Sequence, residues 1–95
     1  MALFAITCWD KPGALDERVK HRPDHVAYLK TQESVIRVAG PQLDEAGLMC
    51  GSLFVIEVED LAAAKAFNAG DPFVQRGVFD KVVIQGFTKT MGSWS

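Results

Sequence analysis

The chain has 95 residues, of which 48% are hydrophobic and 23% are charged, a balance typical of a folded globular domain rather than a disordered segment. Its formal net charge of −2 argues against a nucleic-acid partner, since a dedicated nucleic-acid binder normally carries an excess of Lys and Arg. No uncharged stretch is long enough to span a bilayer, and the N-terminus lacks the basic region of a signal peptide. We therefore expect one cytoplasmic domain over residues 1–95, with 89–95 as a tail, and no membrane partner.

The first half of the chain predicts two strands around a long helix. Residues 2–8 indicate a strand that ends in a turn over 9–13, and apolar spacing indicates a helix over about residues 14–36. Pro23 interrupts this pattern, which predicts a kink or a second helix that starts there. A second strand is expected over residues 35–40, ending at Pro41, with a polar loop over 42–48.

The second half predicts a strand, a helix and a final strand. Residues 50–59 form the strongest strand pattern, and Asp60 is expected to cap a helix over 61–69. A short turn or helix should follow to residue 76, then a strand over 78–87. The tail is expected to be extended or poorly ordered, unless Met91 and Trp94 dock on another part of the protein. This β-α-β-β-α-β order predicts an α+β, ferredoxin-like fold, with a four-stranded antiparallel sheet and two helices on one face.

Both faces of the predicted sheet are apolar, whereas a half-exposed sheet should show polar residues on one side. Residues 50–59 have apolar side chains in both alternating sets. The last strand places Val82 and Ile84 on one side, and Phe79, Val83 and Phe87 on the other. We therefore expect a homodimer in which the sheets of two subunits pack together. Such dimers can also assemble into a larger oligomer. The alternative is that the first helix and the tail cover more of the sheet.

The two cysteines, Cys8 and Cys50, both fall in predicted strands and form no CxxC motif. We expect buried, reduced thiols rather than a disulfide or a metal pair. The chain also has no GxGxxG or GxxxxGK[ST] sequence, which disfavours a nucleotide cofactor. We therefore expect no cofactor.

A cationic stripe on the first helix is one candidate site. Arg18, Arg22, His25 and Leu29 are spaced by four, three and four residues, which places them on one helix face. The alternative is a solvated face whose arginines pair with neighbouring acids. His21 and His25 are spaced for a shared metal, but no further ligands accompany them, so no metal site is expected. Asp71 is a second candidate, although Asp before Pro commonly forms a turn.

Several short motifs occur in a recognisable order. They are Phe4-Ala5-Ile6, Asp10-Lys11-Pro12-Gly13-Ala14-Leu15, Arg18, Arg22-Pro23-Asp24-His25, Ala39-Gly40-Pro41, Gly51-Ser52, Gly70-Asp71-Pro72-Phe73-Val74, Gly77-Val78-Phe79 and Gly86-Phe87-Thr88-Lys89. Together they resemble the YciI-like family of the dimeric α/β-barrel superfamily, over nearly the whole chain. The sequence departs from the family pattern at Phe73, which replaces the usual Tyr, and at Val26, which follows His25 in place of Leu and should change little. The loop after Pro41 is also short, which would open or reshape the cleft.

The resemblance implies a catalytic His–Asp pair, which here is His25 and Asp71. We expect Arg18, Arg22, Ser52 and Phe73 to contribute to substrate binding. A carboxylate that accepts the imidazole N–H fixes its tautomer and raises its basicity, so the free ring nitrogen can move protons near neutral pH. An arginine can hold an anionic substrate oxygen such as a phenolate.

These residues indicate cofactor-free proton transfer, either isomerisation or elimination, because they supply an acid/base and an anion binder but no hydride carrier. Among these, the resemblance favours a cofactor-independent lyase. The resemblance implies dehydrochlorination of a chlorinated hydroxyhydroquinone in aromatic degradation, with a small aromatic or quinol-like substrate. One alternative is a proton-transfer enzyme similar to muconolactone isomerase. Another is a non-catalytic dimeric module that binds a small molecule or a partner protein, and a third is a metal or haem protein of the same superfamily.

Overall fold

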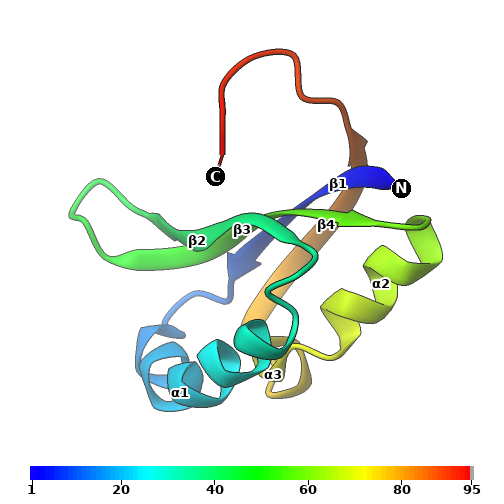
Figure 1. Cartoon of the computed structure of the whole chain (residues 1–95). Coiled ribbons are helices and arrows are strands. Elements are labelled where there is room, and N and C mark those ends of the chain that lie inside the picture. Colours follow the sequence, from blue (N-terminus) through cyan, green and yellow to red (C-terminus); the bar gives the residue numbers. More distant parts are fainter. Residues whose placement is uncertain (95) are drawn as a thin grey trace.

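The computed structural model describes residues 1–94 and shows the expected β-α-β-β-α-β order, with a short third helix before the last strand (Figure 1). The elements are β1 (Ala2–Asp10), α1 (Leu15–Thr31), β2 (Ile36–Leu43), β3 (Met49–Val58), α2 (Leu61–Ala69), α3 (Pro72–Gln75) and β4 (Phe79–Phe87). The four strands form one antiparallel sheet in the order β2-β3-β1-β4. The helices cover one face, and the C-terminal segment curls over the other (Figure 1). No helix within residues 1–94 has the length and apolarity needed to cross a membrane.

Pro23 lies inside one continuous helix, so no second helix begins there. A proline cannot donate to the carbonyl one turn earlier, which here belongs to Val19. Val19 is exposed, so water can reach this carbonyl. The helix is also shorter than predicted, because it ends at Thr31, where the Thr31 hydroxyl donates to the Tyr28 carbonyl at 2.6 Å. The β-branched residues that follow, Val35 and Ile36, lead into β2.

The strand β2 runs through Pro41 to Leu43, so the prediction that Pro41 would end it was wrong. The reason is the position of β2 at the edge of the sheet, where the missing proline N–H leaves no ladder bond unmade. A tight turn then leads to β3. The Asp44 carboxylate closes it by accepting from the backbone N–H groups of Ala46 and Leu48, at 2.9 and 3.0 Å.

Two aspartates start the helices of the second half. Asp60 caps α2 by accepting from the Ala63 N–H at 2.9 Å, and the predicted bounds of this helix are confirmed. Asp71 caps α3 in the same way, through the Phe73 N–H at 2.9 Å. This arrangement carries the chain from α2 into β4 and brings Asp71 beneath the sheet, next to α1.

The core lies between the helices and the sheet and contains Phe4, Ile6, Phe54, Ile56 and Phe73 among its buried members. Phe79 also belongs to this side, because its ring lies 5.8 Å from that of Phe73 on α3. Grouping it with Val83 and Phe87 was therefore wrong. The reason is a register shift between Trp9 and Asp10 in the β1–β4 pairing, which interrupts the alternation of side chains.

The two cysteines are free and differ in their surroundings. Cys8 is fully buried near the end of β1, as predicted, whereas Cys50 is exposed. The prediction that both thiols are buried was wrong for Cys50. It stands near the start of β3, where the β2–β3 hairpin extends beyond the rest of the sheet (Figure 1).

Candidate functional site

His25 of α1 and Asp71 at the start of α3 form a buried pair. The distance from His25 Nδ1 to Asp71 Oδ1 is 2.7 Å, and the two residues are 7% and 1% exposed. An ionised carboxylate can only accept, so the imidazole Nδ1 must carry the hydrogen of this bond. The lone pair of neutral His25 then lies on Nε2, the atom free to exchange protons with a ligand.

The backbone around Asp71 fixes the carboxylate. Its Oδ1 accepts from His25 and from the Phe73 N–H, so the side chain is held from two directions. Gly70 precedes it, and any Cβ there would overlap the hydroxyl of Tyr28, which donates to the Phe67 carbonyl at 2.8 Å. Burial, and then the negative charge of Asp71, raise the pKa of Tyr28. Tyr28 is therefore a neutral donor that ties α1 to the end of α2, just before Asp71.

The second carboxylate oxygen of Asp71, Oδ2, is buried without a hydrogen-bond partner in the described part of the chain. Nearby, burial raises the pKa of the Cys8 thiol to about 12, and Asp71 contributes to the same shift. Cys8 is thus a neutral thiol at physiological pH and not a nucleophile. His25 is the side chain that hydrogen-bonds to the Asp71 carboxylate in the described residues, which is the arrangement an acid/base histidine requires.

The ring of Phe73 lies between His25 and Arg18. The His25 imidazole stacks on it with a centroid distance of 3.9 Å and an angle of 13°, and the Arg18 guanidinium lies 4.7 Å from the same ring centroid. A ring face covered by the imidazole leaves no room for the guanidinium, so the two groups occupy opposite faces. Phe73 therefore restricts the orientation of the histidine ring.

Arg18 is buried and donates three hydrogen bonds to two residues. It donates to both carboxylate oxygens of Asp10, at 2.7 and 2.8 Å, and to the Ser52 hydroxyl at 2.9 Å. These bonds link α1 to the end of β1 and to β3. A buried guanidinium satisfied in this way is an anchor for the helix, and its charge is largely balanced by Asp10.

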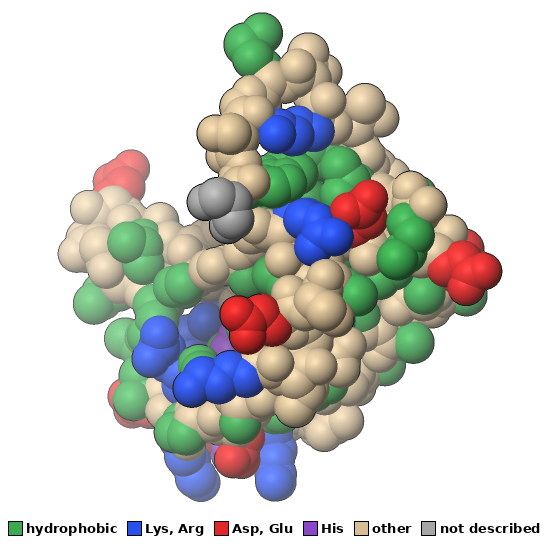
Figure 2. Space-filling model, viewed as in Figure 1, with side chains coloured by type: hydrophobic (Ala, Val, Ile, Leu, Met, Phe, Trp, Pro, Cys, Tyr) green, Lys and Arg blue, Asp and Glu red, His purple; other side chains and the backbone are tan. Residues whose placement is uncertain are grey.

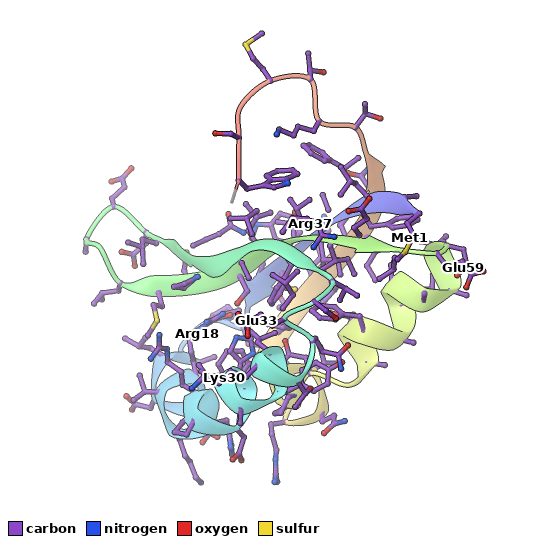
Figure 3. The ribbon with its side chains drawn as sticks, viewed as in Figure 1. Met1, Arg18, Lys30, Glu33, Arg37 and Glu59 are labelled. Carbon is purple, nitrogen blue, oxygen red and sulfur yellow. The ribbon has the colours of Figure 1, made fainter. Side chains whose placement is uncertain are left out.

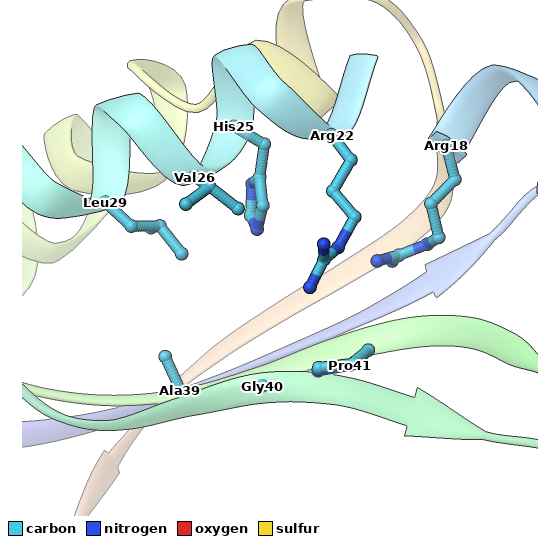
Figure 4. A pocket seen from close by; sticks show the side chains of 8 residues that line it. All are labelled: Arg18, Arg22, His25, Val26, Leu29, Ala39, Gly40 and Pro41. Atoms are coloured by element: carbon cyan, nitrogen blue, oxygen red, sulfur yellow. The ribbon is translucent and has the colours of Figure 1, made fainter. Parts of the chain in front are cut away.

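A cavity of about 190 Å³ opens beside His25 between α1 and β2 (Figure 4). Its lining contains all four residues of the predicted stripe, together with Val26 and the β2 segment Ala39, Gly40 and Pro41. Arg22 points from α1 toward β2 across this space (Figure 4). It is exposed and makes no ion pair within residues 1–94. Figure 2 shows Lys and Arg side chains gathered over α1, with a histidine visible in a recess among them.

The structure thus brings together most of the predicted site. His25, Asp71 and Phe73 are in direct contact, Arg22 lines the cavity, and Arg18 and Ser52 are joined below it. Sequence reasoning placed Asp10 only in a turn and missed it as the partner of Arg18. A buried arginine needs a carboxylate, but the register that brings Asp10 to it is a tertiary property.

His21 lies outside the site. Its imidazole faces Glu17 one turn earlier on α1, with a distance of 3.1 Å between Nε2 and the carboxylate. The proline between the two histidines does not break the helix, but only His25 points at the sheet. No cluster of three His, Cys, Asp or Glu residues suited to a metal ion occurs within residues 1–94.

Known proteins similar to this chain match it over nearly its whole length. Protein YciI of Escherichia coli O6:H1 is 35% identical, covering 92% of this chain and 97% of its own. A protein of Haemophilus influenzae is 36% identical, covering 90% and 96%.

Among solved structures, 5-chloro-2-hydroxyhydroquinone dehydrochlorinase from Burkholderia phenoliruptrix AC1100, in complex with 2,5-dihydroxybenzoquinone, is 31% identical with a TM-score of 0.84, covering 90% of this chain and 93% of its own. A NIPSNAP domain protein from Burkholderia xenovorans, 18% identical with a TM-score of 0.51 and covering 95% of each chain, shares the fold alone. The model of the YCII-related domain matches residues 2–88, and the chain therefore belongs to the YCII-related domain family.

Proposed function

We propose that this protein is a cofactor-independent lyase that eliminates HCl from a chlorinated hydroxyhydroquinone. The observation that carries the proposal is the buried His25–Asp71 pair, with its free Nε2 beside a cavity that also contains Arg22. The similar dehydrochlorinase supports the choice of reaction, since it was solved with a quinone of this chemical class. In another protein, an engineered cavity of about 150 Å³ binds benzene. The cavity of about 190 Å³ beside His25 therefore suits one substituted ring.

The proposed reaction needs only proton transfer. One hydroxyl of the substrate loses its proton, and the ring carbon that bears chlorine gains one, which forms a C–H bond and makes that carbon sp³. A second hydroxyl then loses its proton, its electrons move through the ring, and chloride leaves with the electron pair of the C–Cl bond. The products are a hydroxybenzoquinone, chloride and a proton. No external oxidant or reductant is needed, because the ring is oxidised as the C–Cl bond is replaced by C–H.

Each residue of the site has one task in this scheme. His25 Nε2 removes the hydroxyl proton and returns a proton to the ring carbon, and Asp71 holds the imidazole through Nδ1. Arg22 binds the phenolate oxygen, because its guanidinium faces the cavity without a carboxylate partner in the described residues. The other predicted residues hold these groups in place. Phe73 stacks on the His25 imidazole, and Arg18 anchors α1 through Asp10 and Ser52.

The test is an anaerobic assay of 5-chloro-2-hydroxyhydroquinone that follows chloride release and quinone absorbance. We expect turnover by the wild type and a loss of about 10²–10⁴-fold in kcat for His25→Ala, the usual contribution of a general acid/base. His21→Ala is the matched control, because this histidine lies one turn away and pairs with Glu17. Its rate should stay within about twofold of the wild type. Chloride release that survives His25→Ala, or that the wild type does not show, would contradict the proposal.

We also propose that the protein works as a homodimer. Within residues 1–94, only the C-terminal segment covers the sheet face opposite the helices (Figure 1), and large apolar side chains remain exposed on this face, among them Leu53 and Phe87. A second subunit would bury these side chains and leave the α1–β2 cavity on the other side of the sheet.

A further inference from the structure

The cavity beside His25 continues along α1 as a second, larger hollow of about 500 Å³. The two hollows share three lining residues, Val26, Leu29 and Ala39. Ile36 and Val38 extend the apolar lining along the edge strand β2. The charged residues that complete it stand at the end of α1 and the start of β2: Lys30, Glu33 and Arg37 (Figure 3).

Ala39 stands at the junction of the two hollows. Its partner across the sheet is Phe54, whose side chain is buried on the helix side, so the Ala39 methyl also points toward α1 (Figure 4). A methyl group is too small to close the space beneath Val26 and Leu29. Gly40, the next residue of β2, adds no side chain to this wall, because its position faces the other side of the sheet, like that of its partner Leu53.

The combined space carries charged residues in both hollows and an apolar stretch along α1 and β2. Arg22 and His25 lie at the first hollow, whereas Val26 and Leu29, both half-buried, lead into the second. A single ring fills only the space beside His25 and leaves these two side chains partly in water. A ligand with an apolar group attached to the ring would cover them and gain the corresponding hydrophobic stabilisation.

We infer that the substrate of this site is an anionic, quinol-like ring that carries an alkyl side chain. The ring lies against Arg22 and His25, and the chain passes Ala39 into the groove between α1 and β2. This inference rests on the proposed function and specifies its substrate class. Each buried methylene should tighten binding about fourfold, so a chain that buries two should bind at least tenfold tighter than the bare ring.

The experiment compares two ligands by isothermal titration calorimetry, 2,5-dihydroxybenzoquinone and its 3-pentyl derivative. The proteins are the wild type, Ala39→Leu and Gly40→Ala. The leucine should fill the junction, so that in Ala39→Leu the pentyl compound loses its tenfold advantage over the parent quinone measured with the same variant. Gly40→Ala is the matched control, because its partner is the exposed Leu53 and an added Cβ meets no atom within 4 Å. It should keep the full advantage.

Each result separates this inference from the proposed function. If the parent quinone binds and the pentyl compound gains nothing, the extended substrate is wrong and the quinol chemistry stands. An advantage that persists in Ala39→Leu also overturns the inference, because the chain would then bind elsewhere. If only the pentyl compound binds, and Ala39→Leu abolishes that binding, the alkyl groove is supported. The proposed function is then overturned, because the site does not bind the quinone ring itself. If neither compound binds the wild type, both ideas are overturned.

Discussion

Arg18 and Arg22 lie one turn apart on α1, yet their surroundings give them different tasks. Arg18 is 2% exposed and is held by Asp10 and Ser52. Arg22 is exposed and faces the cavity without an ion pair in the described residues. Removing one partner of a buried ion pair leaves an uncompensated charge, whereas truncating an exposed side chain changes folding little.

Arg18→Met and Arg22→Ala should therefore separate stability from binding. We expect Arg18→Met to lower the free energy of unfolding by about 3–5 kcal/mol, because Asp10 is left buried without a partner. Arg22→Ala should change it by less than about 0.5 kcal/mol. It should raise KM for the chlorinated hydroxyhydroquinone roughly ten- to hundredfold, the value of a charge-assisted hydrogen bond. Urea unfolding and steady-state kinetics measure the two effects. A similar loss of stability in both variants would contradict this division.

The sequence predicted which residues form the site better than it predicted the residues that bind them. The spacing of Arg18, Arg22 and His25 on one helix follows from the geometry of the helix, and the family resemblance paired His25 with Asp71. The partner of Arg18 was not predictable in this way. Asp10 reaches it only because β1 extends two residues beyond the predicted end and its register shifts after Trp9. Local patterns carry no information on such a shift.

At the scale of elements, the errors arose where the surroundings of a proline override its local preference. Pro41 does not end β2, because an edge strand tolerates a missing N–H. Pro23 does not divide α1, because the carbonyl it leaves without a donor belongs to the exposed Val19. By contrast, α2 has its own start signal in Asp60 and good helix formers after it, and its bounds were predicted correctly.

Gly51 tests how tightly β1 and β3 approach at the site. It is buried, and an added Cβ would overlap the backbone carbonyl oxygen of Cys8 on the neighbouring strand. We expect Gly51→Ala to cost about 1–3 kcal/mol, the usual range for overpacking, and to lower kcat because the next residue, Ser52, holds Arg18. Gly86→Ala is the control, since its added Cβ meets no atom within 4 Å. Urea unfolding should show no change above about 0.5 kcal/mol for the control.

A Gly51→Ala protein as stable as Gly86→Ala would show that the strands separate without cost and that this close approach is not needed. The comparison also has a functional side. If Gly51→Ala is destabilised but keeps full activity, the link from Ser52 through Arg18 to the cavity does not matter for turnover.

At the scale of the whole molecule, the two faces of the sheet differ in what covers them. The helices bury one face, whereas the C-terminal segment lies over only part of the other (Figure 1). Trp94 in this segment is half-buried, with the Lys89 ammonium 4.7 Å from its ring centroid, but Met91 remains 87% exposed. Exposed apolar side chains on a small domain indicate an interaction surface, and a two-fold partner would present the same surface in return.

Leu53 gives the sharpest test of this homodimer. It lies on β3, in the interior of the sheet, on the face opposite the helices, and is 41% exposed. Leu53→Glu would bury a charge in the sheet-to-sheet interface, so light scattering after size-exclusion chromatography should change from a mass of at least twice 10.4 kDa to that of one chain. Leu61→Glu is the matched control, because Leu61 is 43% exposed but belongs to α2 on the helical side. A wild type that elutes as a monomer, or a Leu53→Glu variant that stays dimeric, would show that the sheet face is not the interface.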